Sequence, residues 1–400
     1  MNVASEKTKA PKVSAKFTGP NHVQLVRGGK PYFDLLLKLI NNAREIIHLQ
    51  TYIFDDDETG GEVAEALMAA ARRNVAVFVL VDGYASRGLG KEFIRRIRES
   101  GVCFRFFEPL FKSTNFYFGR RMHHKILVTD AQHSLIGGIN ISNRYNDVGG
   151  QPAWLDFGLY SYGKVAREFC LLCAKMWRGF KTSIRVPSCP PFRAAEGMSV
   201  HEESLVRIRL NDWVRGKHQI AATYLRMLRT ASSQLIIMSS YFLPGERFKR
   251  SLRRAVKRGV KIKVVVAGYS DVLIAKNAEK YMYDWLLRHN IEIYEVKDRV
   301  LHAKIATCDG KWMTVGSFNV NDISAHASIE ANVDVSDPEF VRSTEQVLLD
   351  IIKNECQLIT VNRHTRTKNI LRQFYRWLSY QTVRLILFLF TFYFKPKMKG

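Results

Sequence analysis

Short apolar runs alternate with amphipathic stretches through the first half of the chain. Runs of four to eight apolar residues rich in β-branched side chains are typical of buried strands, and apolar residues three or four apart indicate helices. These patterns predict strands at 46–57, 75–83, 102–109, 123–130 and 134–140, and helices at 61–73 and 91–100. Such alternation is typical of an α/β domain with a largely buried sheet.

The second half of the chain repeats the same order of elements. It predicts strands at 235–245, 260–268, 291–296, 301–309 and 313–319, and helices at 247–258 and 277–289. A repeat of this length indicates a duplicated domain rather than a solenoid. We therefore expect an α/β fold of two pseudo-twofold-related domains, each a mixed β-sheet flanked by helices, followed by an amphipathic helical tail.

The domain boundary is expected in a proline-rich stretch, 186–197, which cannot continue a helix or a central strand. The N-terminal residues carry lysines but no apolar segment, which is not the pattern of a secretory signal. The expected division is a disordered basic tail at 1–18, a first domain at 19–190, a second domain at 198–360 and a basic amphipathic tail at 361–400.

Each half carries a motif of the form H-x-K-x4-D, followed by glycine and an asparagine. Side chains two residues apart on a strand point to the same face, so the histidine and lysine of each motif project together. The motifs are His123, Lys125, Asp130 and Asn140, and His302, Lys304, Asp309 and Asn319. Two copies at matching places indicate function, although the two aspartates can instead be structural residues that bond backbone or lysine.

These residue types suit the cleavage of a phosphodiester. One imidazole can attack phosphorus and the other can protonate the leaving oxygen, and we favour His123 as nucleophile and His302 as acid. The lysines and asparagines supply charge and donors for the transition state, and the glycines let the backbone approach the phosphate. Asp156 and Glu330, one downstream of each motif, are candidates to orient the imidazoles. This chemistry needs no cofactor or metal.

Composition narrows the choice of partner and compartment. Lys and Arg number 61 against 37 Asp and Glu, a formal net charge of +24. Such a charge calls for nucleic acid or an anionic membrane surface. Six cysteines do not make a disulfide framework, and Cys170 and Cys173 are interpreted as small packing residues on a helix. This cysteine usage favours a reducing compartment.

The C-terminal tail favours the membrane. Residues 361–400 contain nine Lys or Arg and no Asp or Glu, and Gln381 and Arg384 interrupt the apolar run, so a spanning helix is not expected. Aromatic residues beside arginines are typical of interfacial helices, although the tail could instead pack on the protein or pair with another chain. The expected apolar face consists of Leu371, Phe374, Tyr375, Leu378, Thr382 and Leu385.

The chain resembles the phospholipase D superfamily over roughly residues 20–340 and, within it, the bacterial cardiolipin synthases. The segments that carry the resemblance are 51–57, 123–140 and 301–335. Asn321 and Ser328 depart from the subgroup, which often has Asp and Asn there, and this bears on the acceptor or substrate. The resemblance implies a shared active site at the domain interface, a phosphohistidine intermediate and phosphatidyl transfer between lipid head groups.

We therefore expect a cardiolipin synthase-like phosphatidyltransferase that acts on phospholipids such as phosphatidylglycerol, peripheral on the cytoplasmic face of a bacterial membrane. The alternatives are a hydrolase or nuclease of the same superfamily and a non-catalytic membrane-binding scaffold. The apolar tail weighs against a nuclease, and two complete motifs weigh against a scaffold. The oligomeric state, the donor lipid and the acceptor lipid are not indicated by the sequence.

Overall fold

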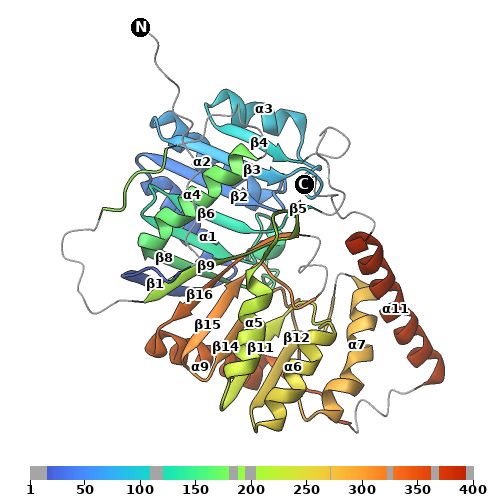
Figure 1. The fold of residues 1–400 in the computed structure, drawn as a ribbon. Helices are drawn as coiled ribbons and strands as arrows, with labels where there is room; N and C mark the ends of the chain where they lie inside the picture. Colours follow the sequence, from blue (N-terminus) through green and yellow to red (C-terminus); the bar gives the residue numbers. More distant parts are fainter. Residues whose placement is uncertain are drawn as a thin grey trace, which may run out of the picture.

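The computed structural model describes residues 16–108, 120–179, 188–193, 204–270, 272–321, 328–361 and 369–392, and the side chains of 370 and 386–392 lie outside that description. Most of the predicted N-terminal tail, part of the proline-rich boundary and the last eight residues of the C-terminal tail therefore lie outside the described residues. Figure 1 shows two α/β halves, one coloured blue to green and the other yellow to red, packed against each other.

The first half is a mixed sheet of seven strands. They are β1 (Asn21–Arg27), β2 (Ile46–Thr51), β3 (Ala76–Asp82), β4 (Cys103–Phe107), β6 (Lys125–Thr129), β7 (His133–Gly137) and β8 (Phe157–Gly163). Their order is β1-β8-β7-β6-β2-β3-β4. The pairs β2–β3 and β3–β4 are parallel and the other pairs are antiparallel. The flanking helices are α1 (Lys30–Asn42), α2 (Glu58–Arg72), α3 (Lys91–Glu99) and α4 (Lys164–Arg178).

The second half repeats this sheet and extends it. Its strands are β9 (Leu205–Asp212), β10 (Lys217–His218), β11 (Gln234–Ser239), β12 (Lys261–Ala267), β13 (Glu292–Val296), β14 (Lys304–Cys308), β15 (Trp312–Gly316), β16 (Ser328–Ser336) and β17 (Cys356–Leu358). The stretch β9-β16-β15-β14-β11-β12-β13 has the strand order and directions of the first sheet. The predicted duplication of a mixed α/β unit is therefore confirmed.

Five helices accompany the second sheet: α5 (Gln219–Thr230), α6 (Glu246–Lys257), α7 (Leu273–Arg288), α9 (Pro338–Glu355) and α11 (Ile370–Phe392). Where a capping side chain is available, it marks the residue at which the helix begins. Asp337 precedes α9, and its carboxylate accepts the backbone N–H groups of Glu339 and Phe340, while Pro338 occupies the first turn. Proline suits that position because the first N–H groups of a helix have no partner within it.

Several predicted strands are shorter than expected, most of all those predicted at 46–57 and 235–245. The first ends at Thr51 and its counterpart at Ser239, and in each case the chain then leaves the sheet. Phe54 instead forms an isolated bridge with Ile141, and Leu243 forms the equivalent bridge with Asn321. The apolar run thus continues past the strand because these residues are buried against the loop that carries each motif asparagine.

One hydrophobic core joins the two halves. It includes Leu159 of β8 and Phe169 of α4 from the first half, together with Ile305 of β14 and Val333 of β16 from the second. Apolar surface buried between two sheets stabilises their association by roughly 25 cal/mol per Å². The halves are therefore packed as one body, which places the ends of their motif strands opposite each other.

The structure corrects the interpretation of the cysteines. Cys170 is buried on α4, as expected of a packing residue, but its sulfur forms a disulfide with Cys189. Cys173, the other half of the C-x-x-C, is a buried free thiol. The partner was missed because Cys189 stands in the proline-rich stretch with no local pattern linking it to the helix. Cysteine usage therefore no longer supports a reducing compartment.

The predicted tail helix is present as α11, which packs along α7. Val383 of α11 is buried with Met282 of α7, and the rings of Tyr281 and Tyr380 lie 5.0 Å apart. Large apolar side chains of α11 outside this contact are exposed: Leu371, Phe374, Tyr375, Trp377, Leu378 and Leu385. Among the described residues, no helix has the length and hydropathy needed to cross a bilayer.

The motif aspartates anchor the edges of the two sheets. Asp130 follows β6 and accepts the backbone N–H groups of the segment entering β2, at 2.7–2.9 Å. Asp309 follows β14 and accepts the N–H groups of Ser232, Ser233 and Gln234 at 2.8–2.9 Å. Each aspartate therefore fixes the start of a neighbouring strand through a charged acceptor.

We predict that Asp309→Asn destabilises the fold. The amide keeps only one acceptor oxygen, so at least one of the three backbone N–H groups loses its hydrogen bond to a charged acceptor. We expect the free energy of unfolding to fall by about 1–3 kcal/mol. Chemical denaturation monitored by circular dichroism measures this loss. Asp350→Asn is the matched control, because Asp350 bonds only the exposed side chain of Gln346 among the described residues. Equal stability of the two variants would contradict the anchoring role.

Candidate active site

The two motif histidines meet at the junction of the halves because each is tied to the backbone of the opposite half. The N–H of His123 donates to the carbonyl of Ile329 at 2.9 Å, and the N–H of His302 donates to the carbonyl of Leu155 at 2.8 Å. The short strand β5 (Arg121–Met122) pairs in parallel with β16, and Leu155 bridges Leu301 in the same way. The connection is thus repeated symmetrically on both sides.

Each imidazole is oriented by a carboxylate from the other half. Nδ1 of His123 lies 2.9 Å from Oε2 of Glu330, and Nδ1 of His302 lies 2.6 Å from Oδ2 of Asp156. Both carboxylates are buried. Since a carboxylate accepts, Nδ1 of each ring carries the proton and Nε2 keeps its lone pair. The sequence pointed to these carboxylates but gave no sign that the pairs cross between halves.

Burial controls the charge of both imidazoles. It lowers the pKa of His123, while the charge of Glu330 opposes the change. It lowers the pKa of His302 further, and the positive charges of Lys304 and Lys125 add to the effect. Both rings are therefore neutral near pH 7 in the absence of an anion.

The two motif lysines lie beneath the histidines. Lys125 and Lys304 are buried, and the ammonium of each donates to the carbonyl of the histidine two residues before it. Burial lowers the pKa of Lys125 to about 7, partly opposed by the charge of Glu330. Histidine and lysine of each motif therefore lie together, and a bound anion would restore the charge that burial disfavours.

The motif asparagines border the same space. Nδ2 of Asn140 donates to the hydroxyl of Tyr145 at 2.8 Å, and that hydroxyl lies 3.4 Å from Nε2 of His302. Oδ1 of Asn319 accepts the hydroxyl of Ser240 at 2.7 Å, and Ser240 also accepts Lys304 at 3.2 Å. Polar contacts thus connect Asn140 to the histidine of the opposite half, and Asn319 to the lysine of its own motif.

The glycine beside Asn140 has a different role from the one expected. A Cβ on Gly138 would lie 2.4 Å from Oδ2 of Asp156, so this glycine makes room for the orienting carboxylate. The matching position in the second half is Ser317, whose hydroxyl donates to Oε2 of Glu330 at 2.5 Å. Close approach to the carboxylate, rather than to a phosphate, therefore accounts for the small residue at this position.

Several residues of the site carried no signal in the sequence. The rings of Tyr145 and Trp154 lie 5.1 and 5.8 Å from that of His302, and Tyr52 lies 4.9 Å from His123. Tyr52 lies in the segment 51–57 that carries the resemblance, but the other two stand in a loop outside any motif. Aromatic walls of this kind exclude water from the imidazoles.

The structure does not bring the motif aspartates into this site. Asp130 and Asp309 stand at the opposite ends of β6 and β14 from the histidines, where they bind backbone. Their inclusion among the candidate catalytic residues is therefore corrected, in favour of the structural alternative. The physical reason is the length of the strand, since five residues of β-structure span about 17 Å.

One group of side chains in the described part of the chain has the spacing of metal ligands. His48, Cys170 and Cys189 place their ligand atoms within 4.8 Å of one another, but the two sulfurs are joined as a disulfide. None of the three contributes to the paired-histidine site. The arrangement at the junction is instead suited to an anion, with two neutral imidazoles facing two buried ammonium groups.

Comparisons with known proteins agree with this geometry. The family described as "Cardiolipin synthase, PLD-like domain" matches residues 36–149 and 224–351. Cardiolipin synthase B of Escherichia coli (strain K12) is 34% identical over 85% of this chain and 82% of its own length. Cardiolipin synthase 1 of Bacillus anthracis is 27% identical over 89% of this chain and 72% of its own length.

The fold is also that of a solved enzyme. The crystal structure of phosphatidylserine synthase from Haemophilus influenzae Rd KW20 superimposes with a TM-score of 0.71, 12% identity and coverage of 92% of this chain and 95% of the other. At that identity the likeness concerns the fold. With both motif-bearing repeats matched and a 34% identical relative aligned along most of its length, the chain belongs to the cardiolipin synthase family of phospholipase D-like proteins.

Proposed function

We propose that the chain is a cardiolipin synthase-like phosphatidyltransferase that joins two phospholipids through a phosphohistidine intermediate. The observation that carries the proposal is the crossed arrangement of two imidazole–carboxylate pairs above two buried lysines. One phosphodiester placed between the rings can be attacked from one side and protonated on the other. The relatives' names supply the product, cardiolipin, and we propose a membrane phospholipid such as phosphatidylglycerol as the substrate.

The first step transfers the phosphatidyl group to His123. Its Nε2 has no hydrogen-bond partner among the described residues, so the lone pair is available to attack phosphorus. The bond from phosphorus to the glycerol oxygen breaks, and His302 gives that oxygen a proton as the glycerol leaves. The negative charge of the phosphodiester offsets the lysines and favours the protonated form of His302 that this step needs.

The second step returns the phosphatidyl group to a new acceptor. The neutral His302 takes a proton from a hydroxyl of a second lipid head group, and the resulting oxygen attacks phosphorus. The phosphorus–nitrogen bond to His123 breaks, which regenerates both imidazoles and yields a lipid dimer. Lys125 and Lys304 hold the non-bridging oxygens throughout, because charge that is fixed before reaction costs no reorganisation in the transition state.

The acceptor distinguishes transfer from hydrolysis. Water in place of the second lipid would give phosphatidic acid, which is the hydrolase alternative. The two positions that depart from the subgroup, Asn321 and Ser328, stand at the two ends of a short segment outside the described residues. Ser328 pairs with Arg121 next to His123, so this rim is where an acceptor would be selected.

We also propose that α11 rests on the membrane surface. Its exposed face presents Leu371, Phe374 and Leu378, with 76%, 59% and 45% of each residue accessible. Aromatic and aliphatic side chains beside arginines settle at the boundary between head groups and acyl chains. The net charge of +24 then favours an anionic leaflet, with each nearby cation contributing about 1 kcal/mol.

We also propose that the enzyme lies on the cytoplasmic face of the membrane. This location leads to a prediction about Cys170 and Cys189. Disulfides rarely persist in the cytosol, so a cytoplasmic enzyme should hold this pair reduced in the cell. We expect both residues to be alkylated by a maleimide in acid-quenched, denatured cells, without prior reduction. Protection of both from the reagent would place this region in an oxidising compartment instead.

The activity itself predicts a defined product. Purified protein incubated with labelled phosphatidylglycerol should form cardiolipin and glycerol, resolved by thin-layer chromatography. Glu330→Gln should slow this turnover by about 10²–10⁴-fold, because the His123 imidazole loses its charged partner. Asp350→Asn, on the exposed surface of α9, is the matched control and should retain activity.

Other products would each contradict the transferase. Phosphatidic acid alone would indicate a hydrolase, and cleavage of DNA supplied in a parallel reaction would indicate a nuclease. An absence of turnover in every assay would leave the non-catalytic membrane-binding scaffold as the remaining alternative.

The roles of the two histidines can be separated with an activated substrate. In a phosphatidyl ester of p-nitrophenol, the p-nitrophenolate group leaves without help from an acid. His302→Ala should therefore still release p-nitrophenol in a burst and retain the label on His123. His123→Ala should give no burst. Quenched-flow kinetics and mapping of the labelled peptide measure both outcomes. A label on His302 in the His123→Ala variant would reverse the assignment.

A further inference from the structure

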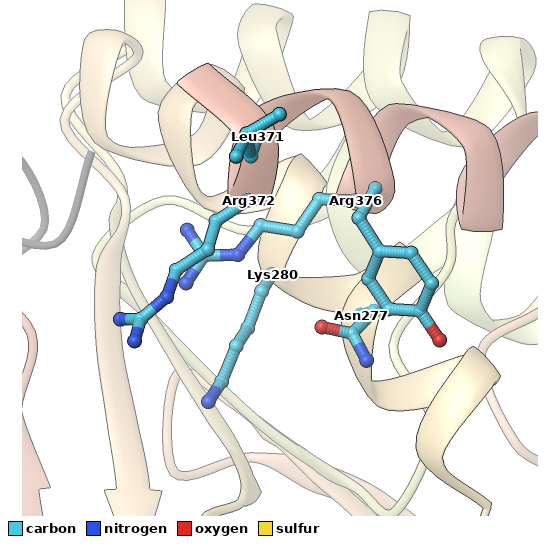
Figure 2. A pocket seen from close by; sticks show the side chains of 6 residues that line it. Asn277, Lys280, Leu371, Arg372 and Arg376 are labelled. Carbon is cyan, nitrogen blue, oxygen red and sulfur yellow. The ribbon is translucent and has the colours of Figure 1, made fainter. Parts of the chain in front are cut away.

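A second cavity lies between α7 and α11, outside the paired-histidine site (Figure 2). Its volume is about 400 Å³. That volume is within the range of sites for small ligands. The residues that line it are Asn277, Lys280, Leu371, Arg372, Tyr375 and Arg376.

Three cations converge on this cavity. Figure 2 shows Lys280 of α7 extending to the same side of the helix pair as Arg372 and Arg376 of α11. Among the described residues, none of the three forms an ion pair with an acid. Burial lowers the pKa of Lys280, and burial together with the charge of Arg372 lowers the pKa of Arg376. The charge of Glu295 opposes both of these changes, and Asp284 also opposes the change at Arg376, but no acid in the described part of the chain contacts the three cations directly. Their hydrogen-bond donors are therefore available to an anionic ligand.

The donors suit the oxygens of a phosphate group. Guanidinium groups bind phosphate through two parallel hydrogen bonds, and an ammonium adds a point charge. Asn277 and Tyr375 add an amide and a hydroxyl at the same wall. Arg372 is exposed and Arg376 half-buried, so a ligand can enter from solvent or from a membrane surface.

Apolar side chains border the cavity on α11. In Figure 2, Leu371 of α11 and Lys280 of α7 lie toward one side, and Arg376 of α11 and Asn277 of α7 lie toward the other, so the two helices run in opposite directions. The start of α11 carries the exposed apolar residues Leu371 and Phe374 beside the cations, and Leu371 also lines the cavity.

We propose that this cavity binds the phosphate of an anionic membrane phospholipid that is not the substrate, and so fixes the helix pair on the bilayer. The inference rests on the proposed membrane location of α11 and goes beyond it by assigning a head-group site to Lys280, Arg372 and Arg376. Nucleic acid would also supply phosphates, but it does not account for the exposed apolar residues Leu371 and Phe374 beside these cations. A lipid matches both the charged pocket and its apolar border.

The test measures binding to vesicles in a His123→Ala background, so that the lipids are not consumed and the result does not depend on turnover. Vesicles of phosphatidylglycerol in phosphatidylcholine are compared with vesicles whose equal surface charge comes from oleate. The parent protein should prefer phosphatidylglycerol. Arg376→Gln and, separately, Arg372→Gln should lose that preference and bind the phosphatidylglycerol vesicles more than roughly twentyfold less tightly.

Arg384→Gln is the matched control, since Arg384 lies on the same helix but stacks on Tyr380 outside the cavity. It removes the same charge and should weaken binding by only about fivefold, the general contribution of one cation. Arg372 is exposed, so its variant keeps the test valid if Arg376→Gln disturbs the docking of α11. Circular dichroism checks each fold.

Three results would overturn the proposal. Equal losses in the Arg372, Arg376 and Arg384 variants would reduce the effect to surface charge. Binding of inorganic phosphate at constant ionic strength, with no preference among vesicles, would assign the pocket to free phosphate. Binding of duplex DNA that is lost in the pocket variants, without vesicle binding, would assign it to nucleic acid. A failure of cardiolipin formation in the separate turnover assay would leave the vesicle result unaffected.

Discussion

The hydrogen bonds between each histidine and the carboxylate of the opposite half are the constraint on which the site depends. Glu330 and Asp156 are buried, and each faces an imidazole at 2.9 or 2.6 Å. Removing the imidazole while the carboxylate stays buried would leave an unpaired charge that costs several kcal/mol, so each half requires the ring of the other in place. The bonds that orient the rings therefore also hold the halves in one relative position. The same hydrogen bonds thus contribute both to the packing of the two halves and to the geometry of the active site.

The buried lysines show why the site favours a phosphodiester. Lys125 and Lys304 are almost fully buried, and each donates to a carbonyl of its own motif. Burial of an ammonium disfavours its charge, which is why the pKa of Lys125 falls to about 7. An anion between the two motifs removes that penalty. The packing that stabilises the fold therefore also keeps these lysines buried. The site carries its full positive charge only when a phosphate is bound.

The sequence predicted those parts of the molecule that local spacing determines. Two-residue periodicity placed His123 with Lys125, and the repeated order of elements predicted two matching sheets. The crossed pairs could not be predicted, because His123 and Glu330 are 207 positions apart and are brought together only by the packing of both sheets. Cys189 was missed for the same reason. Asp130 occupies a conspicuous motif position, yet the length of β6 carries it away from the histidine.

The duplication produced two similar halves, and small differences between them bear on the proposed roles of the histidines. Ser317 donates a hydrogen bond to Glu330, the carboxylate beside His123. The matching residue beside Asp156 is Gly138, which has no side-chain donor; Asp156 accepts the backbone N–H of Phe157, and burial raises its pKa to about 7. A phosphorylated imidazole gains positive character and requires an ionised partner. The carboxylate with the added hydroxyl donor therefore suits the proposed nucleophile, His123, and a carboxyl group whose pKa lies near 7 suits the proton exchange proposed for His302.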